Sequence, residues 1–164
     1  MSTAHETRWL DAAEQRVWEQ LSTMILRLHP LLSAQLRREF GISHFEYLIM
    51  ARLSEAPELR LRISVLATTS GSSVSRLSQA IARLERRGLL SRDPDPRDGR
   101  YTFALLTDTG RQRLEESAPS YVDTVRKFVF DRLTPTQTRQ LGTVCQHILD
   151  GLPPDDSWPS TGSS

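Results

Sequence analysis

The chain has 164 residues, of which 38% are hydrophobic and 25% are charged. These values are close to the average for globular proteins and are enough for one sizeable core, so we expect one domain. The sequence lacks both an apolar run near the roughly 18 residues of a membrane span and the N-terminal basic and apolar regions of a signal peptide. We therefore expect a cytoplasmic protein with no membrane partner.

The composition also argues against an enzyme or a metalloprotein. A single cysteine, Cys145, excludes an internal disulfide and any multi-cysteine zinc site. The four histidines, at positions 5, 29, 44 and 147, do not have metal-ligand spacing. The sequence contains neither a Gly-rich phosphate loop nor a G-x-S-x-G elbow. We predict no catalytic residues, no metal and no cofactor.

The net charge of +1 hides an uneven distribution of charge along the chain. Between Arg60 and Arg100 there are nine arginines and four acids, so this segment carries +5 and the rest of the chain −4. A basic middle between acidic flanks is typical of a protein that binds a polyanion.

The first predicted helix has an unusually wide apolar face. Apolar residues recur every seven positions from residue 10 to residue 31, and two further apolar rows run beside them. The first row is Leu10, Val17, Met24 and Leu31. A face this wide indicates a helix that is buried on two sides, as at a subunit interface.

Breakers and caps divide the next part of the chain. Pro30 is expected to kink or end the first helix, and a following helical stretch should end at Gly41. Ser43 and Glu46 have the spacing of a capping box at the start of another helix, which Pro57 ends.

Two short helices then follow, over residues 62–70 and 74–87, joined by the small-residue turn "SGSS". Ser72 or Ser73 is expected to cap the second helix, which stops at Gly88. This helix has an apolar face consisting of Val74, Leu77, Ile81 and Leu84. Its opposite face is polar and basic and consists of Ser75, Arg76, Gln79, Arg83 and Arg86. This arrangement is typical of a helix-turn-helix.

A β-hairpin is predicted after Gly88. The segments "LLSR" and "YTFALL" have the composition of strands, and "DPDPRDGR" between them has the prolines and the Asp-Gly pair of a hairpin tip. A helix-turn-helix followed by a β-hairpin is a winged helix. We therefore expect a mainly α fold with a small two-stranded wing.

The C-terminal part is predicted to be helical again. A long helix should begin at Thr107, with Pro119 as a kink, and a last helix should have Thr134 as its cap and Pro135 at its first position. The long helix carries an apolar stripe that a winged helix alone would not cover: Val122, Val125, Phe128, Val129 and Leu133. Together with the wide face of the first helix, this stripe predicts a homodimer through both chain ends. Packing of the two ends within one chain is the alternative, and the two are compatible.

These elements divide the chain into three expected regions. Residues 8–40 and 107–150 would form a helical dimerisation region, residues 43–106 a winged helix-turn-helix DNA-binding domain, and residues 151–164 a disordered tail.

The order of these elements closely resembles the MarR family of winged-helix transcription regulators. The wing sequence from Asp95 to Arg100 matches the family's D-x-R-D-x-R pattern, and Leu106-Thr107-x-x-Gly110 follows it. The resemblance extends from about Leu10 to Leu149, and the last helices are most similar to those of actinobacterial members. The chain departs from the family in the turn "TTSGSSVS", which is shorter than the common pattern.

The resemblance implies a function and a set of site residues. It implies a homodimeric regulator, most often a repressor, that binds a pseudo-palindromic operator in double-stranded DNA and is released by a small aromatic effector. The expected effector site lies between the dimerisation helices and the winged helix. Its candidate residues are Trp18, His29, His44, Tyr47 and Arg52, each of which is more often a core or surface residue than a ligand contact.

The expected DNA contacts come from the second helix of the helix-turn-helix and from the wing. Arg76 could bind a guanine or a phosphate, Gln79 could read an adenine, and Arg97 is similar to the family residue that enters the minor groove. The full set of expected contacts is Ser72, Ser73, Ser75, Arg76, Gln79, Arg83, Arg97 and Arg100. Asp95 and Asp98 are expected to hold the wing in shape, by pairing with Arg100 or with the helix.

Three other interpretations compete with this one. A basic helix face can be an ordinary solvated surface. A winged helix can also serve as a protein-interaction module, with the basic face docked on an acidic partner. Cys145 could act as a redox-sensing thiol, although a buried structural cysteine is the more common case.

Overall fold

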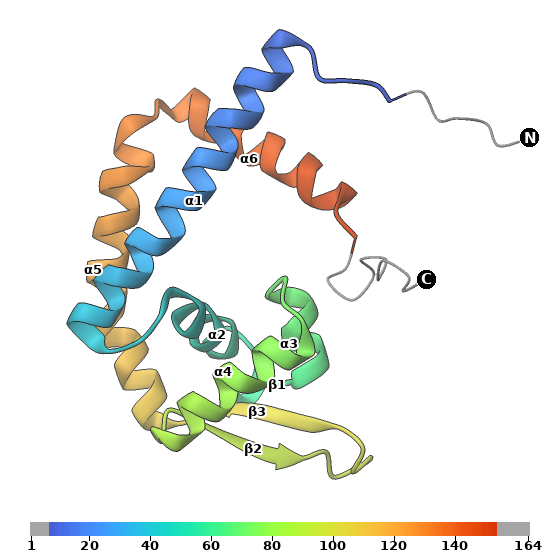
Figure 1. Ribbon diagram of the computed structural model, residues 1–164. Coiled ribbons are helices and arrows are strands. Elements are labelled where there is room, and N and C mark those ends of the chain that lie inside the picture. Colours follow the sequence, from blue (N-terminus) through green and yellow to red (C-terminus); the bar gives the residue numbers. More distant parts are fainter. Residues whose placement is uncertain (1–6, 154–164) are drawn as a thin grey trace, which may run out of the picture.

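The computed structural model describes residues 7–153, which fold into helices and one small sheet (Figure 1). The longer helices are α1 (Ala12–Phe40), α2 (His44–Ser54), α3 (Ile63–Thr69), α4 (Val74–Arg86), α5 (Asp108–Phe128) and α6 (Pro135–Gly151). Two short 3-10 turns lie at Pro57–Leu59 and Phe130–Arg132. The strands are β1 (Arg60–Arg62), β2 (Leu90–Pro94) and β3 (Thr102–Leu106). No helix within residues 7–153 is both long and apolar enough to cross a membrane.

The mainly helical winged fold is confirmed, but the sheet is larger than expected. It has three antiparallel strands in the order β1-β3-β2, whereas the sequence predicted only the hairpin of β2 and β3. Strand β1 is three residues long and pairs Leu61 with Ala104 of β3. A strand this short shows no alternation of apolar and polar residues that the sequence could reveal. It forms because it pairs with the free edge of β3.

The core lies where α2, α3 and α4 pack on the sheet. Its fully buried side chains come from the end of α1, from α2, α3 and α4, and from β2. The largest of them are Leu36, Ile42, Ile49, Met50, Leu53, Leu66, Leu77, Ile81, Leu84 and Leu90. Helix α4 buries the face that the sequence predicted, except that Val74 at its first position is 42% exposed. This core fixes α4 between α2 and the wing.

The expected helix caps are present, but the two internal prolines do not end their helices. Gly41 ends α1 in a left-handed conformation, and Ser43 and Thr134 form capping boxes for α2 and α6. Helix α1 continues through Pro30 and α5 through Pro119, so of the two outcomes expected for Pro30, a kink or an end of the helix, the end is wrong. A proline removes one donor from a helix, and packing of the turns that follow Pro30 offsets this cost.

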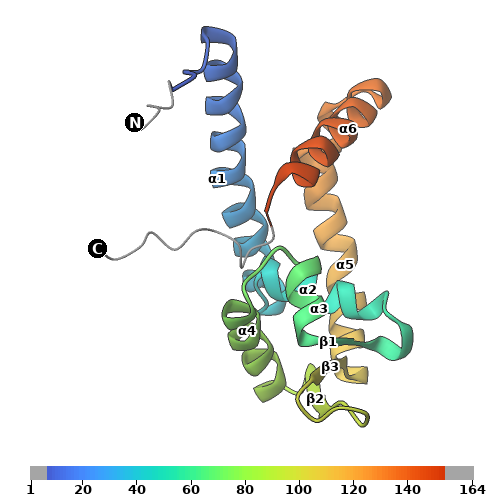
Figure 2. The same ribbon diagram turned by 90° about the vertical axis from the view of Figure 1, so that its right-hand side faces the viewer.

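The long helices extend away from the winged helix. In Figure 2 the N-terminal half of α1 stands apart from α5 and α6, and α6 folds back from the far end of α5. These helices expose many large apolar side chains, among them Val17, Trp18, Ile25, Leu26, Val122, Phe128, Val144 and Leu149. We call the N-terminal half of α1, the far end of α5 and the whole of α6 together the arms. The predicted tail begins at Gly151, the last residue of α6, and lies outside the described residues from position 154 onward.

Four aromatic rings meet where α1, α2 and α5 join. Nδ1 of His44 lies 3.1 Å from Nδ1 of His29, and its Nε2 lies 3.2 Å from the hydroxyl of Tyr121. The rings of Tyr47 and Tyr121 have centroids 4.2 Å apart. Burial, and secondarily the neighbouring His29, lowers the pKa of His44 to about 4. The folded chain therefore favours the neutral form of His44.

The start of α5 is clamped against the turn that follows α4. The hydroxyl of Thr107 donates to the carbonyl of Gly88 at 2.7 Å and accepts a hydrogen bond from the Gly110 N–H. A Cβ at Gly110 would lie 2.0 Å from the carbonyl oxygen of Leu89. Only glycine lets the helix approach the turn this closely.

We expect Gly110→Ala to lower the free energy of unfolding by about 1 to 3 kcal/mol, because the added methyl group must displace backbone. Gly99→Ala is the matched control, since a Cβ there meets no atom within 4 Å. Urea unfolding followed by circular dichroism measures both variants. Equal midpoints for Gly110→Ala and Gly99→Ala would contradict the close contact.

We expect acid to destabilise the fold partly through His44. An unfolded histidine titrates near pH 6.5 and the folded His44 near 4, so the unfolded state binds more protons between these values. The contribution of neutral His44 to the free energy of unfolding is thus fully present above pH 6.5 and is lost as the pH falls toward 4. Melting temperatures across this range should fall less steeply for His44→Gln than for the wild type or for the control His147→Gln, which changes an exposed residue of α6. Identical slopes for all three proteins would rule out this role of His44.

Candidate nucleic-acid interface

The outward face of α4 is polar, basic and exposed. Ser75, Arg76, Gln79, Arg83 and Arg86 are all exposed along it. Ser73 caps the helix and accepts a hydrogen bond from the Arg76 N–H at 3.3 Å. Ser72, by contrast, is only 3% exposed, so the structure does not present this expected DNA contact at the surface. The cap Ser73, with Ser75 and Arg76, forms the part of the face nearest the helix N-terminus.

The first turn of α2 supports two arginines of α4. The guanidinium of Arg76 lies over the ring of Phe45, 4.7 Å from its centroid. Nε of Arg83 donates to Oε1 of Glu46 at 3.0 Å, and Glu46 is only 6% exposed. The sequence identified Glu46 as a capping residue but did not indicate that its second oxygen holds Arg83. These contacts leave Arg76 at the surface and restrain Arg83 beside α2.

The wing is held by two carboxylates, each with its own arginine. Asp98 accepts hydrogen bonds from the Arg100 side chain, the shortest at 2.7 Å from Nη2. Asp95 is 5% exposed and accepts from the Arg97 N–H at 2.9 Å and from Nη2 of Arg62 at 2.6 Å. The backbone N–H of Arg97, and then Arg62, keep the pKa of Asp95 below its usual range. The Arg100 side chain does the same for the pKa of Asp98.

Arg62 supports the wing, although no sequence pattern singled it out. It is the last residue of β1 and immediately precedes α3. Besides its ion pair with Asp95, its guanidinium lies 4.6 Å from the ring centroid of Tyr101 in the wing. Because the partner is 33 positions away, no local pattern could reveal this contact. Arg62 ties the two ends of the wing loop, at Asp95 and Tyr101, to the start of the helix-turn-helix.

Arg97 differs from the other wing residues. Its backbone N–H is held by Asp95, but its side chain is exposed and makes no ion pair within residues 7–153. An anchored backbone with an unengaged guanidinium at the tip is suited to contact an external anion or a groove.

The residues expected to bind an effector do not all come together. His29, His44 and Tyr47 meet at the junction of α1, α2 and α5, together with Tyr121, which the sequence analysis did not select. Trp18 lies away from this junction, near the N-terminal end of α1, where it lines an apolar hollow of about 660 Å³. Arg52 is exposed in the last turn of α2.

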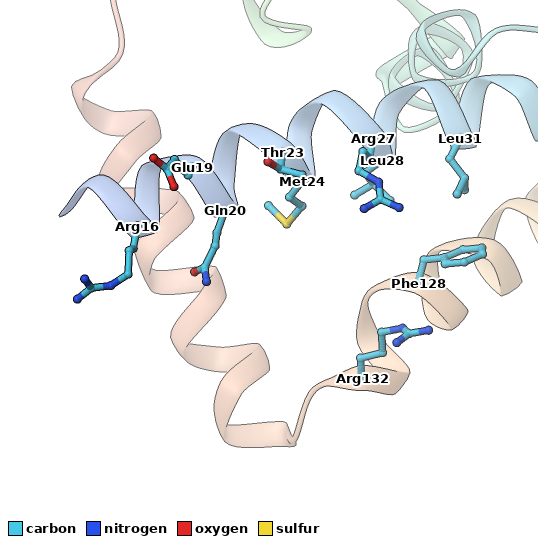
Figure 3. Close-up of a pocket in the computed structure, with 10 residues that line it drawn as sticks. All are labelled: Arg16, Glu19, Gln20, Thr23, Met24, Arg27, Leu28, Leu31, Phe128 and Arg132. Atoms are coloured by element: carbon cyan, nitrogen blue, oxygen red, sulfur yellow. The ribbon is translucent and has the colours of Figure 1, made fainter. Parts of the chain in front are cut away.

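A hollow of about 690 Å³ lies between α1 and the end of α5, and none of these candidates lines it (Figure 3). Met24, Leu28 and Leu31 of α1 face Phe128 of α5 across it. Arginines at its rim come from both sides. Cys145 is exposed on α6 in the single chain, contrary to the buried structural role that is more common for cysteine.

Comparison with known proteins identifies the same architecture. The family model described as "MarR family" matches residues 42–102. An uncharacterised HTH-type transcriptional regulator of Bacillus subtilis, YkoM, is 31% identical over 121 residues, which are 68% of this chain and 75% of that protein.

Two solved structures from Streptomyces coelicolor are similar over nearly the whole chain. Sco3205, a MarR family transcriptional regulator in complex with DNA, is 43% identical with a TM-score of 0.88, covering 93% of this chain and 95% of that one. AbsC, another MarR family transcriptional regulator, is 35% identical with a TM-score of 0.83, covering 88% of this chain and 97% of that one. These similarities include the arms as well as the winged helix, and the chain therefore belongs to the MarR family of transcription regulators, which act on DNA.

Proposed function

We propose that this regulator binds a pseudo-palindromic operator as a homodimer and represses transcription from it. The observation that carries the proposal is the exposed basic face of α4 beside a wing whose tip presents Arg97. Residues 43–106 would form the DNA-binding domain, and residues 8–40 and 107–150 the dimerisation region.

The N-terminal part of α4 is the part that would enter the major groove. Ser73 and Ser75 are small, so the helix can approach the bases closely, and the positive end of the helix dipole favours a phosphate. Arg76 and Gln79 are long enough to reach base edges from this position. Arg97 would enter the adjacent minor groove, where a narrow A·T tract attracts a guanidinium.

The arms supply the means of dimerisation. Leu26 of α1 is 73% exposed in the single chain, and apolar residues are exposed on α5 and α6 as well. Patches of this extent are rare on monomeric proteins and are typical of subunit interfaces. A two-fold axis through the arms would place two copies of α4 about one DNA turn, or roughly 34 Å, apart.

A small aromatic effector would bind at the junction of α1, α2 and α5. The support for this site is the group of His29, His44, Tyr47 and Tyr121, which offers aromatic faces with polar atoms between the arms and the winged helix. A ligand that separated these rings would shift the arms relative to α4 and weaken operator binding.

We expect Arg76→Ala and Arg97→Ala each to weaken operator binding by about 1 to 3 kcal/mol if they contact bases. Duplex DNA flanking the protein's own gene and a scrambled duplex are titrated across a salt series. If the removed arginine contacts a base, the variant loses the preference for the operator duplex over the scrambled one. If it contacts a phosphate, the affinity of the variant depends less steeply on salt concentration. Arg126→Ala, an exposed change on α5, is the control.

Unchanged binding in both variants would remove the proposed site. Weak, sequence-independent binding of the wild type, together with capture of an acidic protein by the same face, would favour the protein-interaction module.

We expect Val17→Asp to dissociate the dimer while each chain stays folded. Val17 is exposed in the single chain, so the carboxylate costs little there but would be buried and unpaired between two copies. Sedimentation velocity over a concentration series measures the change. Gln15→Asp, on the polar side of the same helix, should leave the dimer intact, and a dimeric Val17→Asp protein would contradict an interface through α1.

A further inference from the structure

A second basic surface lies beside α4, away from its N-terminal turn. It is a hollow of about 450 Å³ between the end of α1, the start of α2 and the C-terminal half of α4. Four of its seven lining residues are arginines. The full lining is Arg37, Gly41, Ser43, Glu46, Arg83, Arg86 and Arg87. We call it the arginine hollow.

The charges of the arginine hollow are not balanced. Glu46 is the only acid in its lining, and both carboxylate oxygens are engaged: Oε2 accepts from the Ser43 N–H at 2.9 Å and Oε1 from Arg83 at 3.0 Å. Arg37 and Arg86 are exposed and make no ion pair within residues 7–153. Once Glu46 is set against Arg83, three positive charges remain.

Part of this surface is held rigidly. Nη1 of Arg87 donates to the carbonyl of Gly41 at 2.9 Å, which fixes the guanidinium at the C-terminal end of α1. The contact of Arg83 with Glu46 fixes a second guanidinium. Arginines whose position is set in advance lose less side-chain entropy on binding an anion, and their planar forks suit phosphate oxygens.

The arginine hollow continues the outward face of α4. On a helix of 3.6 residues per turn, Arg83 and Arg86 project on the same side as Ser75, Arg76 and Gln79. Ser75 and Arg86 are separated by about 16 Å along the axis, whereas the major groove is only about 12 Å wide. A helix whose first turn reaches the bases therefore carries its other end toward the sugar-phosphate wall of the groove.

We propose that the arginine hollow binds a backbone phosphate of the operator, at the wall of the major groove that the start of α4 enters. This inference rests on the proposed function and adds to it a contact that fixes how α4 is oriented in the groove. The contact carries no base preference, because every sequence presents the same phosphate.

The test is the salt dependence of DNA binding by Arg37→Ala and Arg86→Ala. Each lost phosphate contact reduces the slope of log K against log salt by about 0.9, so a dimer with two hollows should lose about 2. Both variants should weaken binding to the operator and to a scrambled duplex by the same factor. Arg86→Lys should retain most of the slope, and Arg126→Ala on α5 should retain all of it. Thermal melts of every variant establish that the fold is intact.

Three results would overturn the proposal. The first is that Arg37→Ala and Arg86→Ala show the same slope of log K against log salt as the wild type, while the wild type itself has a steep slope. This result would leave the proposed function standing. The second is a loss of base preference in either variant. The third is stabilisation of the wild type by inorganic phosphate at fixed ionic strength that depends on Arg37 and Arg86, with unchanged DNA slopes, because the hollow would then hold a free anion. Failure of the wild type to bind DNA at any salt concentration would overturn the proposed function as well.

Discussion

One buried carboxylate joins the first turn of α2 to the basic face of α4. Glu46 closes the capping box of α2 with one oxygen and holds Arg83 of α4 with the other. A buried carboxylate with one partner removed would be costly, so each contact stabilises the other. Because α2 is itself packed on the core, Glu46 links the core to the exposed basic face of α4.

The wing is tied to the same unit by a different device. Asp95 joins the backbone at Arg97 to the side chain of Arg62, and Arg62 stands at the boundary between β1 and α3. The first helix of the helix-turn-helix and the loop of the wing are thus linked through one ion pair. Within the loop Asp98 also holds Arg100, whereas the Arg97 side chain makes no ion pair within the described residues. The wing therefore combines a loop backbone that is held in place with the exposed guanidinium of Arg97.

Local patterns in the sequence were sufficient for the helices, the hairpin and most caps. Ser43, Thr107 and Thr134 were identified because a cap depends on residues three positions apart. The missing pieces are those that depend on distant partners. Strand β1 exists through pairing with β3, and Arg62 is engaged by a residue 33 positions away. Pro30 does not end its helix, one of the two outcomes expected for it, because packing of the following turns keeps the helix continuous.

The same distinction applies to the candidate site. The amphipathic pattern of α4 placed Arg76, Gln79, Arg83 and Arg86 on the exposed face, but spacing could not indicate that Ser72 is buried. Among the expected effector residues, three meet at the helix junction and two do not. Spacing could not indicate how far from the junction Trp18 lies on α1, nor that Arg52 is exposed at the other end of α2.

Helix α5 connects the two ends of the molecule as a single rod. Its first turn is clamped to the turn after α4 by Thr107 and Gly110, and its last residue, Phe128, lies in the arms. Its 21 residues span about 31 Å. A tilt of about 5° at the clamped end would therefore displace the far end by about 3 Å, which follows from the same helical rise. The length of α5 thus makes it a lever: a small change of angle at the contact of Thr107 and Gly110 with the turn after α4 corresponds to a shift of the arms that is comparable to the length of a hydrogen bond.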